Sequence, residues 1–162
     1  MLALAHAPVG PEGGHAAGRR LLERLYREQT GKPMPPILLQ PGGKPFFAKG
    51  KLHFSLSHTQ HHVFCALSDR PIGIDAEETD RKINLKLAEK ILSAEEYAQW
   101  LAAEDRRKAL LTFWVLKEAE AKYTGKGILG YPNQTRFRLD DPRVTEQYGC
   151  LIAVAEEIRS EC

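Results

Sequence analysis

The sequence of 162 residues predicts an α+β fold. Residues 52–58 alternate apolar and polar side chains, which is the period of a half-buried strand. Residues 106–123 contain neither Gly nor Pro and end shortly before Gly125, which is typical of a helix. A helix followed by two strands is expected twice along the chain, and this repeat hints at an internal duplication.

The first part of the chain starts with a segment rich in Gly, Pro and Ala, residues 1–15, which we expect to be a poorly ordered leader. The leucines of residues 16–29 have helical spacing and precede a stopping glycine, Gly31, so a helix is predicted there. Three strands are expected after this helix, over 52–58, 62–68 and 71–77.

Helices dominate the second part. Residues 85–92 and 93–101 predict two helical segments, and Ser93 followed three residues later by Glu96 indicates a capping box. The long helix follows, and two closing strands are expected over 135–140 and 148–157. We divide the chain into the leader, a first half at 16–79 and a second half at 80–162.

Composition excludes several classes of function. The 23 basic and 21 acidic residues leave a net charge of +2, which gives no reason to expect nucleic acid as a partner. The three cysteines have no CxxC spacing, so neither a disulfide framework nor a zinc knuckle is predicted, and a reducing cytosol is the simplest compartment. No apolar run is long enough to predict a membrane span, and we expect a monomer.

Two carboxylates mark the strand predicted at 71–77. Ile72 and Ile74 point to the core, whereas Gly73, Asp75 and Glu77 share the opposite face, where the glycine leaves room beside the carboxylates. Two converging carboxylates repel unless a cation holds them, and oxygen ligands favour a hard ion such as Mg²⁺. A solvated strand face is the alternative, because so short a motif occurs often by chance.

A third carboxylate, Glu118, shares a helix face with Lys122 one turn later. An exposed ion pair on a charged helix explains this pair equally well. Lys44 lies between Gly43 and Pro45 in a turn whose backbone N–H groups and ammonium suit an anion.

Ser57 and His58 end the first strand and would also suit an anion. His58 taken with His61 and His62 is alternatively a chance polar cluster. No Cys or HExxH spacing supports a transition-metal site there.

The order of these motifs resembles that of the 4′-phosphopantetheinyl transferases, specifically the larger surfactin-type class. The matching stretches are GGKPFF at 42–47, FSLSH at 54–58, IGIDAE at 72–77 and FWVLKEAEAKYTGKGI at 113–128. The resemblance implies two pseudo-symmetric halves, each a small, mainly antiparallel sheet with helices, with coenzyme A and Mg²⁺ between them. It also implies transfer of the phosphopantetheine arm to a serine of an apo acyl or peptidyl carrier protein, with release of 3′,5′-ADP.

The resemblance assigns roles by position. Asp75, Glu77 and Glu118 are implied metal ligands, and Glu118 is also the implied base, acting directly or through water. Lys122 is implied to reach the pyrophosphate and to share in catalysis. The implied coenzyme A contacts are Gly43, Lys44, Pro45, Ser57, His58 and Lys122.

The chain departs from the family at its start, where larger members carry a strand and a basic helix that help to hold the coenzyme A 3′-phosphate. Arg19 or Arg20 is a candidate to compensate, and an exposed arginine without this role is an equal alternative. The basic segment 79–92 is either a docking surface for an acidic carrier or an amphipathic segment with solvated lysines.

Two other functions compete with the family activity. One is another Mg²⁺-dependent phosphotransfer enzyme, such as a nuclease or phosphatase, since three carboxylates would serve there too. The other is a non-catalytic relative that binds carrier proteins or nucleotides. The order of the GKP and SH motifs argues against the first, and retention of every matched acidic and basic position argues against the second.

Overall fold

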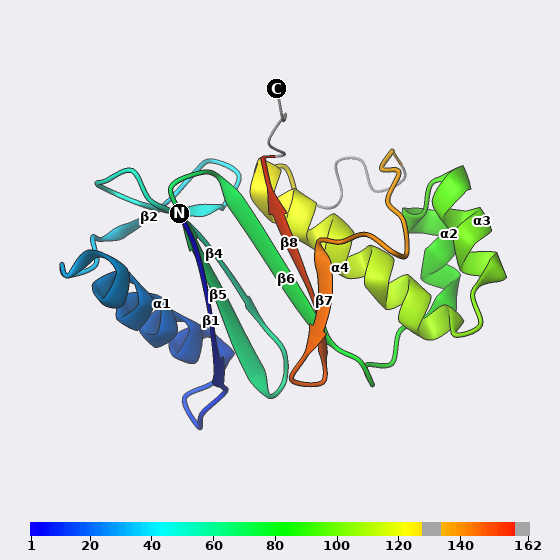
Figure 1. Cartoon of the computed structure of the whole chain (residues 1–162), viewed down its shortest axis with the longest axis horizontal. Helices are drawn as coiled ribbons and strands as arrows, with labels where there is room; N and C mark the ends of the chain where they lie inside the picture. The colour runs from blue at the N-terminus through cyan, green and yellow to red at the C-terminus, as the bar shows by residue number, and fades with distance from the viewer. Residues whose placement is uncertain (128–133, 158–162) are drawn as a thin grey trace.

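A computed structural model describes residues 1–127 and 134–157 of the chain. The described residues form a mixed α+β structure with strands and helices in the order shown in Figure 1. The first part contains β1 (Leu2–Pro8), α1 (Gly14–Thr30), β2 (Ile37–Leu39), β3 (Pro45–Phe47), β4 (His53–His58), β5 (His62–Ser68) and β6 (Ile72–Glu78). The second part contains the 3₁₀ turn η1 (Leu85–Leu87), α2 (Ala88–Ile91), α3 (Ala94–Ala102), α4 (Arg106–Thr124), β7 (Val144–Gln147) and β8 (Cys150–Glu156).

The first antiparallel sheet has the order β1-β5-β4, and α1 packs against it. Contrary to the expectation of a disordered leader, Leu2–Pro8 forms a strand that pairs with β5 along its whole length. The reason is its alternation: Ala3, Ala5 and Ala7 pack against the core beneath α1, while Leu2 and Leu4 on the other face are exposed. The Gly and Pro content of the leader concealed this period of two.

The second sheet has the order β6-β8-β7 and is covered by α4. Its arrangement repeats that of the first sheet: a leading strand, a helix after it, and two further strands of which the last lies in the middle. Figure 1 shows these two sheets side by side, with α1 beside the first sheet and α4 running across the second. The mixed fold is therefore confirmed, whereas the boundaries at 16–79 and 80–162 stay predictions.

Two serine side chains join the sheets. Ser55 Oγ accepts a hydrogen bond of 3.0 Å from Ile74 N, and Ser57 Oγ accepts one of 3.1 Å from Ala76 N. Phe64, on β5, packs with Ile74 and neighbouring apolar residues in a core between the sheets. The halves thus share a buried contact, and β4 lies directly beside the strand that carries Asp75.

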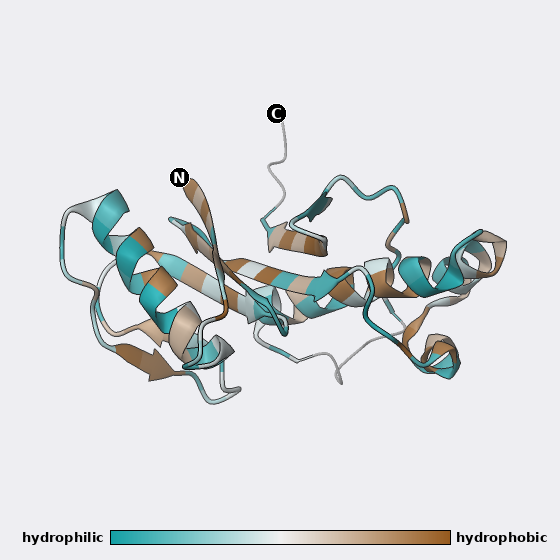
Figure 2. Ribbon diagram, turned by 90° about the horizontal axis from the view of Figure 1, so that it is seen from below, coloured by the Kyte–Doolittle hydropathy of each residue, from teal (hydrophilic) through white to brown (hydrophobic). Residues whose placement is uncertain are grey.

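The helices begin and end close to the expected residues. Gly125 closes α4 with a left-handed backbone, φ 72°, and Ser93 and Glu96 form the expected capping box at α3. Hydrophobic and hydrophilic residues alternate along α1, as Figure 2 shows, so that its apolar side faces the sheet. No helix among the described residues combines the length and the apolar character needed to cross a bilayer.

The prediction of a strand over residues 135–140 is wrong. The described backbone of this segment, from residue 135 onward, is bonded to side chains of α3 instead of to a strand. Phe137 N donates to Glu96 Oε2 at 2.9 Å, and Leu139 N donates to Gln99 Oε1 at 3.1 Å. The strand that pairs with β8 comes later, at Val144–Gln147.

Candidate active site

Close packing between β6 and α4 brings the acidic residues of both elements together. Gly73 lies on the face of β6 that meets α4, where a Cβ would be 2.0 Å from the carbonyl oxygen of Ala119 and 2.5 Å from Tyr123 N. The sequence suggested that Gly73 leaves room beside the carboxylates. In the structure the backbone of α4 fills that room, so the glycine sets how near the helix can approach.

Asp75 is buried, with 6% of its surface exposed, and is held by two side chains. Its Oδ1 accepts hydrogen bonds from Lys122 Nζ at 2.8 Å and from Ser57 Oγ at 3.2 Å. Its Oδ2 is buried and has no hydrogen-bond partner among the described residues. Burial raises the pKa of the Asp75 carboxyl, although the positive charge of Lys122 opposes this.

Glu77 is two residues further along the same face and forms an ion pair with Arg81. Burial raises the pKa of the Glu77 carboxyl, and the charges of Asp75 and Glu118 raise it further, against the lowering influence of Arg81. Glu77 therefore lies in the field of both other carboxylates.

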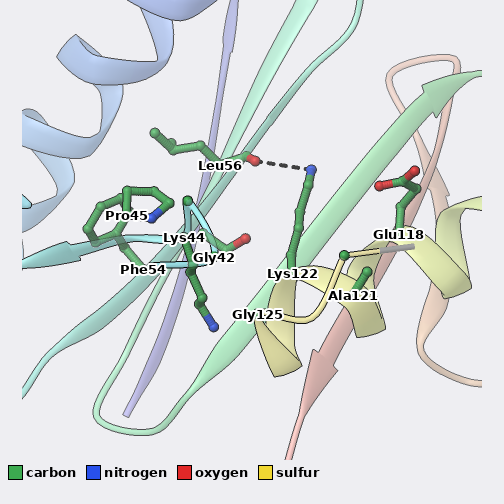
Figure 3. Close-up of a pocket in the computed structure, with 12 residues that line it drawn as sticks. Gly42, Lys44, Pro45, Phe54, Leu56, Glu118, Ala121, Lys122 and Gly125 are labelled. Carbon is green, nitrogen blue, oxygen red and sulfur yellow. Dashed lines mark hydrogen bonds between the residues drawn. The ribbon is translucent and has the colours of Figure 1, made fainter. Parts of the chain in front are cut away.

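Glu118 is half-buried on α4. Burial raises the pKa of its carboxyl, the charge of Asp75 adds to this, and Lys122 and Arg81 oppose it. Figure 3 shows Glu118 and Lys122 extending to the same side of α4, as their spacing predicts. The expected triad of carboxylates is thus electrostatically coupled across β6 and α4.

A cavity of about 270 Å³ lies beside Glu118, where residues 42–45, β4 and α4 meet. Lys44 and Lys122 both line it. Lys44 Nζ donates to the carbonyl oxygen of Tyr123 at 2.8 Å, and Lys122 Nζ donates to that of Leu56 at 3.2 Å. The cavity is therefore lined by two lysines and by a glycine turn in which Gly43 has a left-handed backbone, φ 85°. Such a lining suits an anion.

Other expected contact residues lie outside the lining of this cavity. The hydroxyl of Ser57 is turned to Asp75, so it orients a carboxylate. The ring of His58 lies over Gly14, where a Cβ would be 2.5 Å from Nδ1. Arg19 is exposed on α1. Of the expected coenzyme A contacts, the cavity brings together Gly43, Lys44, Pro45 and Lys122.

The donor set fits a hard divalent cation. Among the residues that the structure describes, no three His, Cys, Asp or Glu side chains converge closely enough to hold a metal as they stand. The carboxylates of Asp75 and Glu77 are instead turned to Lys122 and Arg81. Among the described residues, Asp75 Oδ2 nevertheless lacks a hydrogen-bond partner, and the negative charges of Glu77 and Glu118 repel that of Asp75. Such a group of carboxylate oxygens is the kind of ligand set that Mg²⁺ prefers.

Sequence reasoning missed two features of this site. Ser55 lines the cavity and joins the sheets, and only its alternation with Ser57 signalled a shared face. Arg81 lies in the basic segment 79–92, for which the sequence suggests only a contact with the carrier, although its spacing of four residues from Glu77 permits the ion pair that the structure contains.

A family model and the relatives that match this chain carry the same description. A family model described as the 4′-phosphopantetheinyl transferase superfamily matches residues 71–159, which is more than half of the chain. The 4′-phosphopantetheinyl transferase psf-1 of Bacillus pumilus is 38% identical over 149 residues, covering 81% of this chain and 64% of that protein. The enzyme gsp of Aneurinibacillus migulanus is 37% identical over 116 residues, covering 68% of this chain and 48% of that protein.

The enzyme Sfp of Bacillus subtilis is 37% identical over 107 residues, covering 65% of this chain and 42% of that protein. The matches thus span 42% to 64% of the length of these three relatives. The region that the family model matches includes β6 and α4, which carry the three carboxylates.

Proposed function

The chain belongs to the 4′-phosphopantetheinyl transferase superfamily, and on that premise we propose that it transfers the phosphopantetheine arm of coenzyme A to a serine of an apo carrier protein. The carrier is of the acyl or peptidyl type, and 3′,5′-ADP is released. The observation that carries the proposal is the meeting of Asp75, Glu77 and Glu118 with Lys122 beside a cavity lined by Lys44.

Coenzyme A binds in this cavity through its phosphates. Lys44 and Lys122 supply positive charge, and the turn containing Gly43 and Pro45 allows the nucleotide to approach the backbone. Ser57 and His58, at the end of β4, and Arg19, on α1, are more distant candidates for the nucleotide phosphates. Among these three, Ser57 acts by orienting Asp75.

Asp75, Glu77 and Glu118 would hold Mg²⁺, and the orphaned Oδ2 of Asp75 supports this assignment. The bound ion would neutralise negative charge on the pyrophosphate during the transfer. Ser57 and Lys122 fix the other oxygen of Asp75, so that Oδ2 keeps its orientation.

Glu118 receives the proton of the attacking serine, directly or through a water molecule. Its carboxylate lines the cavity proposed for coenzyme A, where a serine brought to the phosphate would come within its reach. The serine oxygen forms a bond to the phosphorus that bears the pantetheine, and the bond from this phosphorus to the bridging oxygen breaks. Lys122 offsets the negative charge that moves onto the departing 3′,5′-ADP.

The proposed site lies within one chain, so we infer that a monomer is sufficient. Cys65 and Cys150 are free, buried thiols, which agrees with a reducing cytosol as the compartment.

The test is to incubate the protein with coenzyme A, Mg²⁺ and a panel of apo carriers, and to follow the carriers by mass spectrometry. One phosphopantetheine should be added per carrier, and 3′,5′-ADP should appear in equal amount. Binding of coenzyme A without conversion of any carrier would favour a non-catalytic relative. Hydrolysis of nucleic acids or phosphate esters without carrier modification would favour another phosphotransfer enzyme.

A further inference from the structure

Arg81 follows β6 by three residues and interacts with Glu77 of the proposed site and with Trp114 on α4. Its guanidinium forms an ion pair with Glu77 and lies over the ring of Trp114, with Cζ 5.9 Å from the ring centroid. Arg107 on α4 donates to the carbonyl oxygens of Thr79 and Arg81, which fixes the backbone of this turn. The guanidinium is thus directed at Glu77 by an anchored turn, while 42% of the Arg81 side chain remains exposed.

The two cations beside the carboxylates differ in how firmly they are held. Lys122 Nζ donates to Asp75 and also to the carbonyl oxygen of Ile74 at 3.0 Å and that of Leu56 at 3.2 Å. Among the residues that the structure describes, the guanidinium of Arg81 has one ion-pair partner, Glu77, and it lies over an aromatic ring. Arg81 can therefore leave its carboxylate at lower cost than Lys122 can.

A guanidinium and a divalent cation cannot share Glu77 favourably. The N–H groups of Arg81 occupy a carboxylate oxygen that a metal would need, and the two positive charges would repel at this distance. Arg81 also contributes positive charge at Glu118, so it offsets two of the three proposed ligands.

We propose that Arg81 is an internal competitor for the metal: it neutralises Glu77 in the metal-free protein, and its guanidinium is displaced to solvent when a divalent cation binds. This rests on the proposed metal site. Arg81 thereby lowers the affinity for the free ion and offsets the repulsion among the carboxylates until metal arrives. It is a positioning residue, since it acts through Glu77.

The test is to measure Mn²⁺ binding to the full chain without coenzyme A, by electron paramagnetic resonance of the free ion, and Mg²⁺ binding by calorimetry. Arg81→Met should bind Mn²⁺ more tightly by a factor on the order of five, as expected when one partly exposed charge is removed. Lys82→Met is the matched control, because it removes the same charge from the next residue, which has no ion pair to a described carboxylate within 4.0 Å. Arg81→Lys should fall between wild type and Arg81→Met.

A second background separates direct competition from a general charge effect. In Glu77→Gln, the substitution Arg81→Met should raise Mn²⁺ affinity much less than in the wild-type background, since the competed carboxylate has gone and only the weaker influence of Arg81 on Glu118 remains. An equal gain in Lys82→Met and Arg81→Met, or no gain in Arg81→Met, would overturn the proposal. Absence of Mn²⁺ binding in every variant would overturn it together with the metal site, whereas the carrier mass assay reports on the transferase activity independently.

Discussion

Lys117 Nζ lies 2.7 Å from Glu96 Oε1, and both side chains are almost completely buried. The same carboxylate accepts hydrogen bonds from Ser93 N and Phe137 N, both at 2.9 Å, and from the Thr135 hydroxyl at 3.0 Å. This network joins the start of α3, the middle of α4 and the segment that contains Thr135 and Phe137. It fixes the part of α4 that carries Glu118.

The buried pair predicts that Lys117→Met will destabilise the fold. Removal of one partner leaves an uncompensated buried carboxylate, so the free energy of unfolding should fall by about 3–5 kcal/mol. Urea unfolding followed by circular dichroism measures this. The double variant Glu96→Gln with Lys117→Met should recover part of the loss, because the amide is neutral. A loss of less than about 1 kcal/mol in the single variant would show that the pair is not important for stability.

From the sequence, only the contacts between Ser93 and Glu96 in this network could be predicted. Ser93 and Glu96 indicated a capping box because its signature is local. Lys117 stands in a charged stretch typical of an exposed helix, and its burial depends on how α3 packs on α4. The strand expected over 135–140 was wrong for the same reason, since its backbone is bonded to side chains that are remote in sequence.

The motifs of the proposed site are easier to recognise from the sequence than the contacts of their residues. The alternation along β6 correctly predicted that Asp75 and Glu77 share a face, and helical spacing correctly paired Glu118 with Lys122. No local pattern predicts that Lys44 meets the carbonyl of Tyr123, because that contact depends on the docking of two separate elements. Residue types could therefore be assigned from motifs, whereas their partners required the tertiary structure.

Gly73→Ala should displace α4 from β6. The added Cβ would overlap backbone atoms, which cannot move as a side-chain end can. The free energy of unfolding should fall by about 1–3 kcal/mol, as for other overpacked cores, and the turnover number should fall with it. Gly18→Ala on α1 is the matched control, since its Cβ would have only ordinary contacts at 3.9 Å, and it should not destabilise the chain. Equal stability of the two variants would contradict this account of Gly73.

Asp75→Ala and Glu118→Ala should each abolish transfer, because each removes a proposed metal ligand. Glu118→Ala should leave the fold largely intact, whereas Asp75→Ala should also lower the melting temperature, because it removes the buried partner of Lys122. Glu77→Ala should be milder, since water can replace one oxygen ligand of Mg²⁺. The measurement is carrier modification by mass spectrometry, with melting temperatures recorded in parallel. Glu78→Ala provides a control, because this neighbouring carboxylate is bonded to Thr59 and His61 and not to the proposed ligands. Retained turnover in Asp75→Ala or Glu118→Ala would refute the assignment.

Lys44→Ala and His58→Ala should mainly weaken coenzyme A binding, since each offsets phosphate charge already present before reaction. The KM for coenzyme A should rise on the order of tenfold for Lys44→Ala, as expected for one lost hydrogen bond to a charged group, with little change in kcat. Calorimetric titration with coenzyme A checks the affinity directly. Lys49→Ala, an exposed lysine outside the cavity lining, should behave as wild type. An unchanged affinity would remove the substituted residue from the site.

The segment over residues 79–92 presents a charged surface beside the proposed metal ligands. Ile83 and Leu87 pack against the core of the second half, whereas Lys82, Lys86 and Leu85 are exposed. The apolar residues are therefore divided between core and surface, and the lysines are free to meet a partner in solution. Both earlier interpretations, carrier docking and plain structure, are compatible with this arrangement.

Charge reversal in residues 79–92 distinguishes a carrier-docking role from a purely structural role. Carrier proteins of this family are expected to be acidic around the modified serine, so Lys82→Glu with Lys86→Glu should raise the carrier KM several-fold and flatten its dependence on salt. Charges at the rim of an interface act mainly on association rate, so coenzyme A affinity should not change. Adding Arg81→Glu should raise the carrier KM further.

Arg81 also contacts Glu77, so metal affinity must be measured alongside in the triple variant. The paired reversal Arg24→Glu with Arg27→Glu, on the exposed side of α1, controls for total charge and should leave the carrier KM unchanged. If the carrier KM at low salt is the same in the triple variant as in wild type, residues 79–92 have no docking role. A rise in the α1 control as well would mean that overall charge, and not this segment, attracts the carrier.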